Sequence, residues 1–130
     1  MKQKEVTLCG KKVVLAYCYA TEIAYKLLSD EDITQFGSEV IQNIQNEQMP
    51  DIKRSIYLIL AAMNAYYDSQ GQQSPVTDKE LMYECTPNEL GSAIGTVIGL
   101  RADFYYVPKD EPNEEKTDDD KPEGEKGKNA

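Results

Sequence analysis

The 130-residue chain has no histidine, no tryptophan and only two phenylalanines. Without histidine it cannot form a Ser-His-Asp triad, a Cys-His pair or an imidazole metal site. This excludes many hydrolase mechanisms, although lysine, cysteine and carboxylate chemistry stay open. Since no catalytic constellation of those residues stands out either, we expect a protein that is not an enzyme and uses neither cofactor nor metal.

Basic residues are also scarce. The chain has 14 Lys and Arg against 23 Asp and Glu, a formal net charge of −9. Residues 1–107 carry −5 of this charge and residues 108–130 carry −4. Because neither part offers a positive surface that would neutralise phosphates, we expect no nucleic-acid partner.

Long apolar runs are absent too. The longest uninterrupted one, residues 56–63, is far too short to span a bilayer, so we expect no membrane partner. A short apolar run ending at Cys18 faintly resembles a lipoprotein leader, but bulky Tyr17 stands where a small residue is required. Three cysteines without a C-x-x-C pair suit buried reduced thiols. We therefore expect a cytoplasmic protein.

The apolar residues that are present lie almost entirely in one part of the chain. Of the 52, all but Ala130 fall within residues 1–107, which makes this part about half apolar. That proportion is typical of a folded domain. We expect one compact domain over 1–107 and a disordered acidic tail over 108–130, since the tail cannot build a core.

Alternating polar and apolar residues over 4–9 and 12–17 predict a β-hairpin around Gly10 and Lys11. Helical spacing then predicts a helix capped by Thr21 and running to about residue 29, with an apolar side. Gly37 interrupts the next periodic segment. We expect only a short turn before it and a peripheral helix over 38–46 after it.

The strongest helix is predicted over 50–68, where Pro50 suits the first helical position. Its apolar residues cover nearly every side, as expected of a central helix. Two later segments, starting at Thr77 and Thr86, have the spacing of capping boxes and predict helices over 77–84 and 86–106. The fold class is therefore α+β, mainly α: a hairpin followed by about five helices.

The last predicted helix carries glycines at every fourth position, Gly91, Gly95 and Gly99, with Ala102 close to the same face. Each glycine costs up to about 1 kcal/mol against alanine inside a helix, so a close neighbour is expected. The stripe either packs against the helix over 50–68 or forms a docking groove for a partner helix. Nearby tyrosines, with Tyr66 and Tyr105 as candidates, would suit such a protein interface.

The order of elements resembles that of the tail assembly chaperones of long-tailed phages and prophages. The resemblance covers about residues 4–107. It lies in the glycine-turn hairpin of residues 6–15, the helix that follows, the Ala- and Tyr-rich helix near 57–67, and the segment 74–77 before a pair of helices. These are patterns of residue class, and no catalytic residue comes with them because the family is non-enzymatic.

The resemblance implies a function. Such chaperones bind the tape-measure protein, keep its long apolar helices soluble and recruit tail-tube subunits in the cytoplasm of the bacterial host. The glycine face would then provide the partner groove, and the acidic tail would keep the complex soluble. The alternative is another phage or host structural or adaptor protein, and a homo-oligomer stays open.

Overall fold

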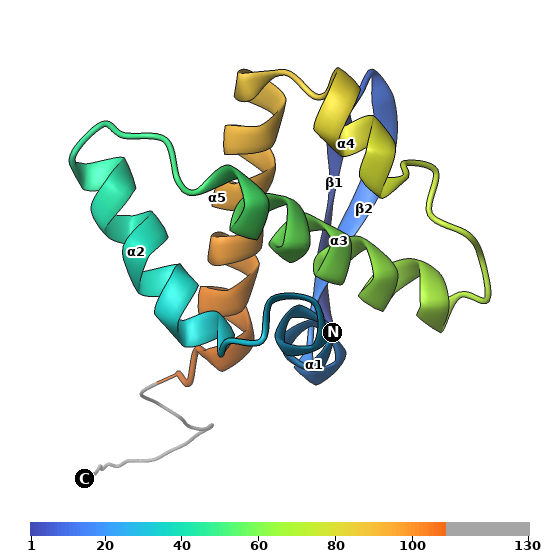
Figure 1. The fold of residues 1–130 in the computed structure, drawn as a ribbon. Helices are drawn as coiled ribbons and strands as arrows, with labels where there is room; N and C mark the ends of the chain where they lie inside the picture. Colours follow the sequence, from blue (N-terminus) through green and yellow to red (C-terminus); the bar gives the residue numbers. More distant parts are fainter. Residues whose placement is uncertain (109–130) are drawn as a thin grey trace, which may run out of the picture.

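The computed structural model describes residues 1–108. This part is an α+β fold, mainly helical, with one antiparallel hairpin followed by five helices (Figure 1). The elements are β1 (Lys2–Leu8), β2 (Lys11–Tyr17), α1 (Tyr19–Ser29), α2 (Ile33–Gln45), α3 (Ile52–Ser69), α4 (Asp78–Glu84) and α5 (Pro87–Tyr105). The predicted fold class is confirmed. The tail predicted over 108–130 lies, beyond Pro108, outside the described residues.

The hairpin has a two-residue turn. Strand pairing runs from Lys2 opposite Tyr17 to Leu8 opposite Lys11, which leaves Cys9 and Gly10 as the turn residues. Both have positive φ, 53° and 74°, as a turn that matches strand twist requires. The turn therefore lies one residue earlier than predicted, and it places a cysteine in a conformation that is uncommon for any residue but glycine.

The helices enclose the hairpin from several directions. In Figure 1, α5 runs alongside the hairpin in the direction opposite to β1, and α3 crosses it. α4 lies at the turn end of the hairpin and α1 at the other end. The largest fully buried side chains come from the hairpin and from all the longer helices: Leu8, Leu15, Tyr17, Tyr25, Phe36, Leu58, Ile59, Met63 and Ile94.

The first helix starts two residues before its predicted cap. Cys18 is the N-cap, and Thr21 lies inside the first turn, where it is fully buried. Its hydroxyl accepts a hydrogen bond from the Cys18 amide and donates one to the carbonyl oxygen of Ala16. The prediction of Thr21 as N-cap is wrong because this side chain bonds to the preceding strand.

The second helix is continuous from Ile33 to Gln45, so the predicted break at Gly37 is wrong. Gly37 is buried and lies in the packed interior, where a Cβ would stand 3.9 Å from Ile98 Cδ1. Phe36 and Val40 on the same helix are fully buried, so α2 is not merely peripheral. Burial of these side chains outweighs the helix-breaking tendency of one glycine.

The three later helices follow the predictions closely. α3 begins two residues after Pro50, because the Asp51 carboxylate caps it by accepting a hydrogen bond from the Arg54 amide at 2.9 Å. Both predicted capping boxes are present, one from Thr77 with Glu80 and the other from Thr86 with Glu89. These short-range signals are confirmed because each box is completed within four residues.

Candidate functional site: two candidate protein-binding surfaces

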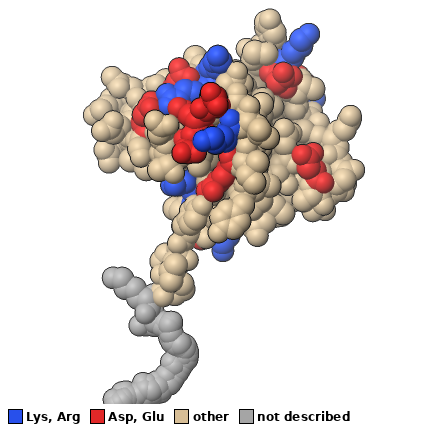
Figure 2. Space-filling model, turned by 60° about the horizontal axis from the view of Figure 1, so that its bottom comes forward, with Lys and Arg blue, Asp and Glu red and all other residues tan. Residues whose placement is uncertain are grey.

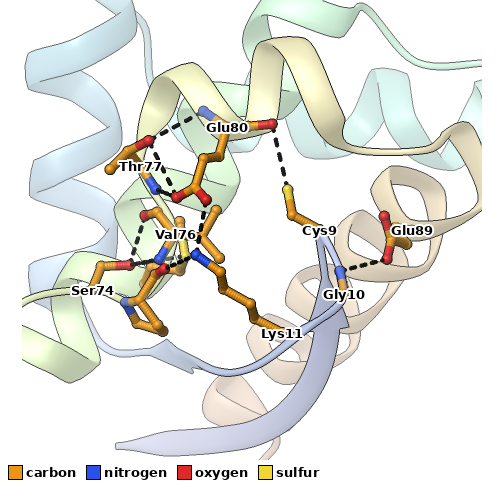
Figure 3. Close-up of polar contacts among 10 residues, drawn as sticks. Cys9, Gly10, Lys11, Ser74, Val76, Thr77, Glu80 and Glu89 are labelled. Atoms are coloured by element: carbon orange, nitrogen blue, oxygen red, sulfur yellow. Dashed lines mark hydrogen bonds and ion pairs between the residues drawn. The ribbon is translucent and has the colours of Figure 1, made fainter.

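The hairpin turn is tied to the start of α4 and α5 by polar contacts (Figure 3). Lys11 Nζ donates hydrogen bonds to Glu80 Oε2 at 2.8 Å and to the carbonyl oxygen of Pro75 at 3.1 Å. The Gly10 amide donates to Glu89 Oε2 at 3.2 Å. Because Glu80 and Glu89 also complete the two capping boxes, each carboxylate fixes a helix start and the hairpin at once.

These contacts also set the acidity of the two carboxyl groups. The Lys11 ammonium, aided by the Thr77 amide, lowers the pKa of Glu80. The amides of Thr86 and Gly10 lower the pKa of Glu89. Both groups are therefore held as carboxylates, which suits a structural contact rather than proton transfer.

Two cysteines meet at the same corner. The Cys9 thiol donates a hydrogen bond to the carbonyl oxygen of Glu80 at 3.4 Å, and the Cys85 thiol donates one to the carbonyl oxygen of Thr86 at 3.7 Å. Burial raises the pKa of Cys9, and the nearby Glu89 carboxylate raises it further. Burial, with the neighbouring Cys9, raises the pKa of Cys85 to about 11. Since a reactive cysteine needs a lowered pKa, this pair is unsuited to nucleophilic chemistry.

A second polar network joins α2 to α3. The Arg54 guanidinium donates to both carboxylate oxygens of Glu39 at 2.7 Å and to those of Glu31 at 2.8 and 3.2 Å. It also lies over the Phe36 ring, 4.8 Å from the centroid. Hydrogen bonding to Arg54 lowers the pKa of Glu39. With all these carboxylate oxygens occupied by one arginine, the cluster is structural.

A third network fixes the end of α5 against α1. The hydroxyl groups of Tyr17 and Tyr105 both donate to Glu22 Oε2, at 2.7 and 2.5 Å. Burial and this hydrogen bond raise the pKa of Tyr17, and the hydrogen bond to Glu22 raises the pKa of Tyr105. The Tyr19 ring meets Phe104 edge-on at 5.2 Å. These contacts hold α1 and the last turn of α5 together.

The outer face of α1 carries an unusual row of exposed apolar side chains. Tyr19, Ile23 and Leu27 are 64%, 61% and 81% exposed and lie four residues apart, which places them on one helix face. We call this row the α1 ridge. The apolar side that sequence periodicity assigned to this helix therefore points largely to solvent. Tyr106 and Val107, just beyond the turn of α5 that packs on α1, are also exposed.

Figure 2 views the molecule with its lower side turned forward. Acidic and basic side chains gather there mainly in one mixed cluster, and most of the remaining surface carries neither. Uncharged residues, polar and apolar alike, make up the rest of this face.

The predicted glycine stripe does not pack against a neighbouring helix. A Cβ added at Gly91, Gly95 or Gly99 would meet no atom within 4 Å beyond its own helix. The expectation of close packing on α3 is therefore wrong. The buried side of α5 is instead formed by its larger apolar residues, Leu90, Ala93, Ile94, Val97 and Leu100, because their burial stabilises the fold more.

Two glycines of the stripe, Gly95 and Gly99, border a groove between β1 and α5. It consists of two adjoining hollows of about 470 and 340 Å³. We call it the β1–α5 groove; residues 4–7 form one wall, and the other is Asn88, Glu89, Ser92, Gly95, Thr96, Gly99, Leu100 and Asp103. Gly91 and Ala102, the other candidates on this helix, do not line it.

The two candidate tyrosines lie elsewhere. Tyr66 is half-buried on α3 and packs edge-on against Tyr67 at 4.9 Å. Tyr105 belongs to the α1–α5 contact described above. The six residues proposed from sequence thus do not form one surface. The signal that could have located the α1 ridge was its four-residue apolar spacing, which core packing would have explained equally well.

Another apolar hollow of about 500 Å³ lies between the start of α3 and α4. Its lining consists of Ile52, Lys53, Ile56, Tyr57 and Met82. Within residues 1–108, no three His, Cys, Asp or Glu side chains are grouped closely enough to hold a metal ion. Over the same residues, no helix is both long enough and apolar enough to cross a membrane.

Comparison with known proteins gives no match among family models, curated proteins or solved structures.

Proposed function

We propose that the chain is a non-enzymatic binding protein that covers apolar helices of an assembly partner, and that it is a tail assembly chaperone of a long-tailed phage or prophage. Its partners would be the tape-measure protein and tail-tube subunits, in the cytoplasm of the bacterial host. The single observation that carries this proposal is the α1 ridge: Tyr19, Ile23 and Leu27 are exposed on a helix that is anchored by the fully buried Thr21 and Tyr25.

The spacing of the ridge suits a helical partner. Side chains at i, i+4 and i+8 form a row along one helix, and a second helix packs against such a row through its own apolar stripe. An unassembled tape-measure helix presents a stripe of this kind to solvent, where it favours aggregation. Covering it with the α1 ridge would remove apolar surface from water on both molecules, which stabilises the complex by about 25 cal/mol per Å².

The packing beneath the ridge favours binding without rearrangement. Tyr25, on the opposite side of α1, is fully buried and donates a hydrogen bond to Glu31 Oε2 at 2.6 Å. Glu22 fixes the helix to the end of α5. A rigid ridge loses little conformational entropy on binding, which favours affinity.

Co-expression with a helical fragment of the tape-measure protein tests this proposal. The fragment alone should be insoluble and should become soluble in complex with the full chain. Ile23→Glu should abolish this effect, because a carboxylate would be buried in the interface. Ile44→Glu is the matched control, since Ile44 is similarly exposed on α2. Equal solubilisation by both variants, or none by the unchanged chain, would refute the proposal.

A further inference from the structure

The two edges of the hairpin differ. Helix side chains bind the outer edge of β2 at two points: the Val14 amide donates to Tyr67 Oη at 3.0 Å, and the Ala16 carbonyl oxygen accepts from Thr21 Oγ1 at 2.9 Å. β1 has no such cover. Gln3, Glu5 and Thr7 are all exposed.

The pairing pattern shows which groups the open edge presents. In an antiparallel ladder, opposed residues alternate between pairs that exchange hydrogen bonds and pairs that do not. Val14 directs its amide away from β1, so the Glu5–Val14 pair belongs to the second kind. Gln3, Glu5 and Thr7 therefore direct their backbone N–H and C=O groups outward. No hydrogen bond to these groups is found among residues 1–108.

The groove beside this edge has room for another chain. Gly95 and Gly99 are exposed on its α5 wall, and a Cβ at either position would contact nothing. At these two positions the α5 wall therefore presents no side chain to an extended strand lying along β1. A helix would fit the edge less well, because its backbone groups are already bonded within it.

Charge indicates which kind of strand fits. The groove is lined by the carboxylates of Glu5, Glu89 and Asp103 and by a single cation, Lys4. The whole chain carries −9. A strand with lysine or arginine opposite Glu5 would form a favourable cross-strand pair. The charges already on β1 oppose indiscriminate edge pairing.

A second copy of β1 fits less well. The antiparallel register that overlaps all seven residues of two β1 strands places Glu5 directly opposite Glu5 of the other copy. Like charges in directly opposed positions destabilise strand pairing. Any other register shortens the overlap of the two strands, and one of these shifted registers also places Lys4 opposite Lys4.

We propose that the open edge of β1 is a docking site for a basic, extended segment of a partner protein, which adds to the hairpin as a third strand along the β1–α5 groove. The backbone groups of Gln3, Glu5 and Thr7 provide the hydrogen bonds, and Glu5 and Asp103 select the charge. This site is separate from the α1 ridge, so each can be tested without the other.

Nuclear magnetic resonance of the full ¹⁵N-labelled chain can test the site. The probe is a seven-residue peptide in which threonine and valine alternate with lysine, blocked at both ends. Its addition should shift the amide signals of Gln3, Glu5 and Thr7 and slow their exchange with solvent. The same peptide with a central proline should have little effect, because it lacks one donor.

Matched variants separate the edge from the rest of the molecule. Thr7→Pro removes an outward amide that the hairpin does not use, so the fold should persist while peptide binding weakens on the order of tenfold. Thr7→Val keeps the amide and should bind as the unchanged chain does. Glu5→Lys should weaken binding about fivefold by opposing charge.

Several outcomes would overturn the inference. One is peptide binding that leaves Gln3, Glu5 and Thr7 unshifted, and another is equal binding by the Thr7→Pro and Thr7→Val variants. Protection of these amides without peptide would also overturn it. Protection that rises with protein concentration would mean that a second copy occupies the edge. Protection that does not depend on concentration would mean that residues 109–130 occupy it.

Discussion

The Tyr67 hydroxyl group accepts a hydrogen bond from the Val14 backbone amide at 3.0 Å, so a side chain from α3 takes the place of a neighbouring strand. This contact and the one between Thr21 and the Ala16 carbonyl oxygen occupy part of the β2 edge, whereas no hydrogen bond to the outward groups of β1 is found within residues 1–108. The Tyr67 contact also connects the central helix to the sheet through a polar group in an otherwise apolar contact.

Tyr67→Phe should lower the free energy of unfolding by about 1–3 kcal/mol, because the partly buried Val14 amide loses its acceptor. Urea unfolding would measure the loss, and hydrogen exchange should show faster exchange at Val14. Tyr66→Phe is the control: its hydroxyl makes no hydrogen bond within the described part of the chain. An equal loss in both variants would contradict the assigned role of the Tyr67 hydroxyl.

Arg54→Lys should lower the free energy of unfolding by about 1 kcal/mol. A lysine cannot reproduce the paired hydrogen bonds to Glu31 and Glu39 or the stacking on Phe36. Lys26→Ala removes only the exposed contact with Asp32 at 3.2 Å and should cost less than about 0.5 kcal/mol. Thermal and urea unfolding of both variants would check this order, and a reversed order would show that the Arg54 network contributes little.

Acid should weaken the contacts that Glu80 and Glu89 make with Lys11 and Gly10 at the hairpin turn. The folded pKa values of Glu80 and Glu89 lie below their ordinary value of 4.5, so the unfolded chain binds protons first as the pH falls. Their contribution to stability is complete above about pH 4.5. It is then lost as the pH falls through the lower folded values.

Urea unfolding between pH 7 and pH 3 would test this. Glu80→Gln should reduce the pH dependence in the acidic range, because the titrating group is gone. Glu84→Gln is the control, since the Glu84 carboxylate accepts no hydrogen bond among residues 1–108. The assignment fails if the two variants follow the same pH profile.

Gly95→Ala should raise the free energy of unfolding by about 0.5–1 kcal/mol, because alanine is the better helix former and nothing occupies the space that its methyl group needs. Gly95→Leu should leave the domain folded but obstruct the β1–α5 groove. Circular dichroism and the peptide titration would separate these effects. Unfolding of Gly95→Leu would mean that the glycine has a packing neighbour after all.

The parts of this fold that could be predicted from sequence are those completed by neighbouring residues. The capping boxes at Thr77 and Thr86 each involve residues three apart, and both are present. The hairpin follows from alternation around one glycine. In contrast, the course of the helix through Gly37 depends on Ile98 and the rest of the core, 61 positions away in the numbering, and local pattern carries no information on it.

The candidate site was harder to predict for a related reason. α5 has apolar or small residues on nearly all sides, so sequence alone could not decide whether its glycines or its leucine and valine residues faced the core. The α1 ridge had the spacing of a core-facing stripe but points to solvent. The contacts of Lys11 with Glu80 and of Gly10 with Glu89 join residues 69 and 79 positions apart and have no local signature.

The contact between Gly10 and Glu89 has a consequence for folding during translation. Gly10 leaves the ribosome 79 residues before its partner Glu89, a delay of about 4–16 seconds at 5–20 residues per second. Throughout that interval the first strands to be made lack α5, the helix that runs alongside them. The N-terminal hairpin therefore reaches its final structure late, after most of the domain has been translated.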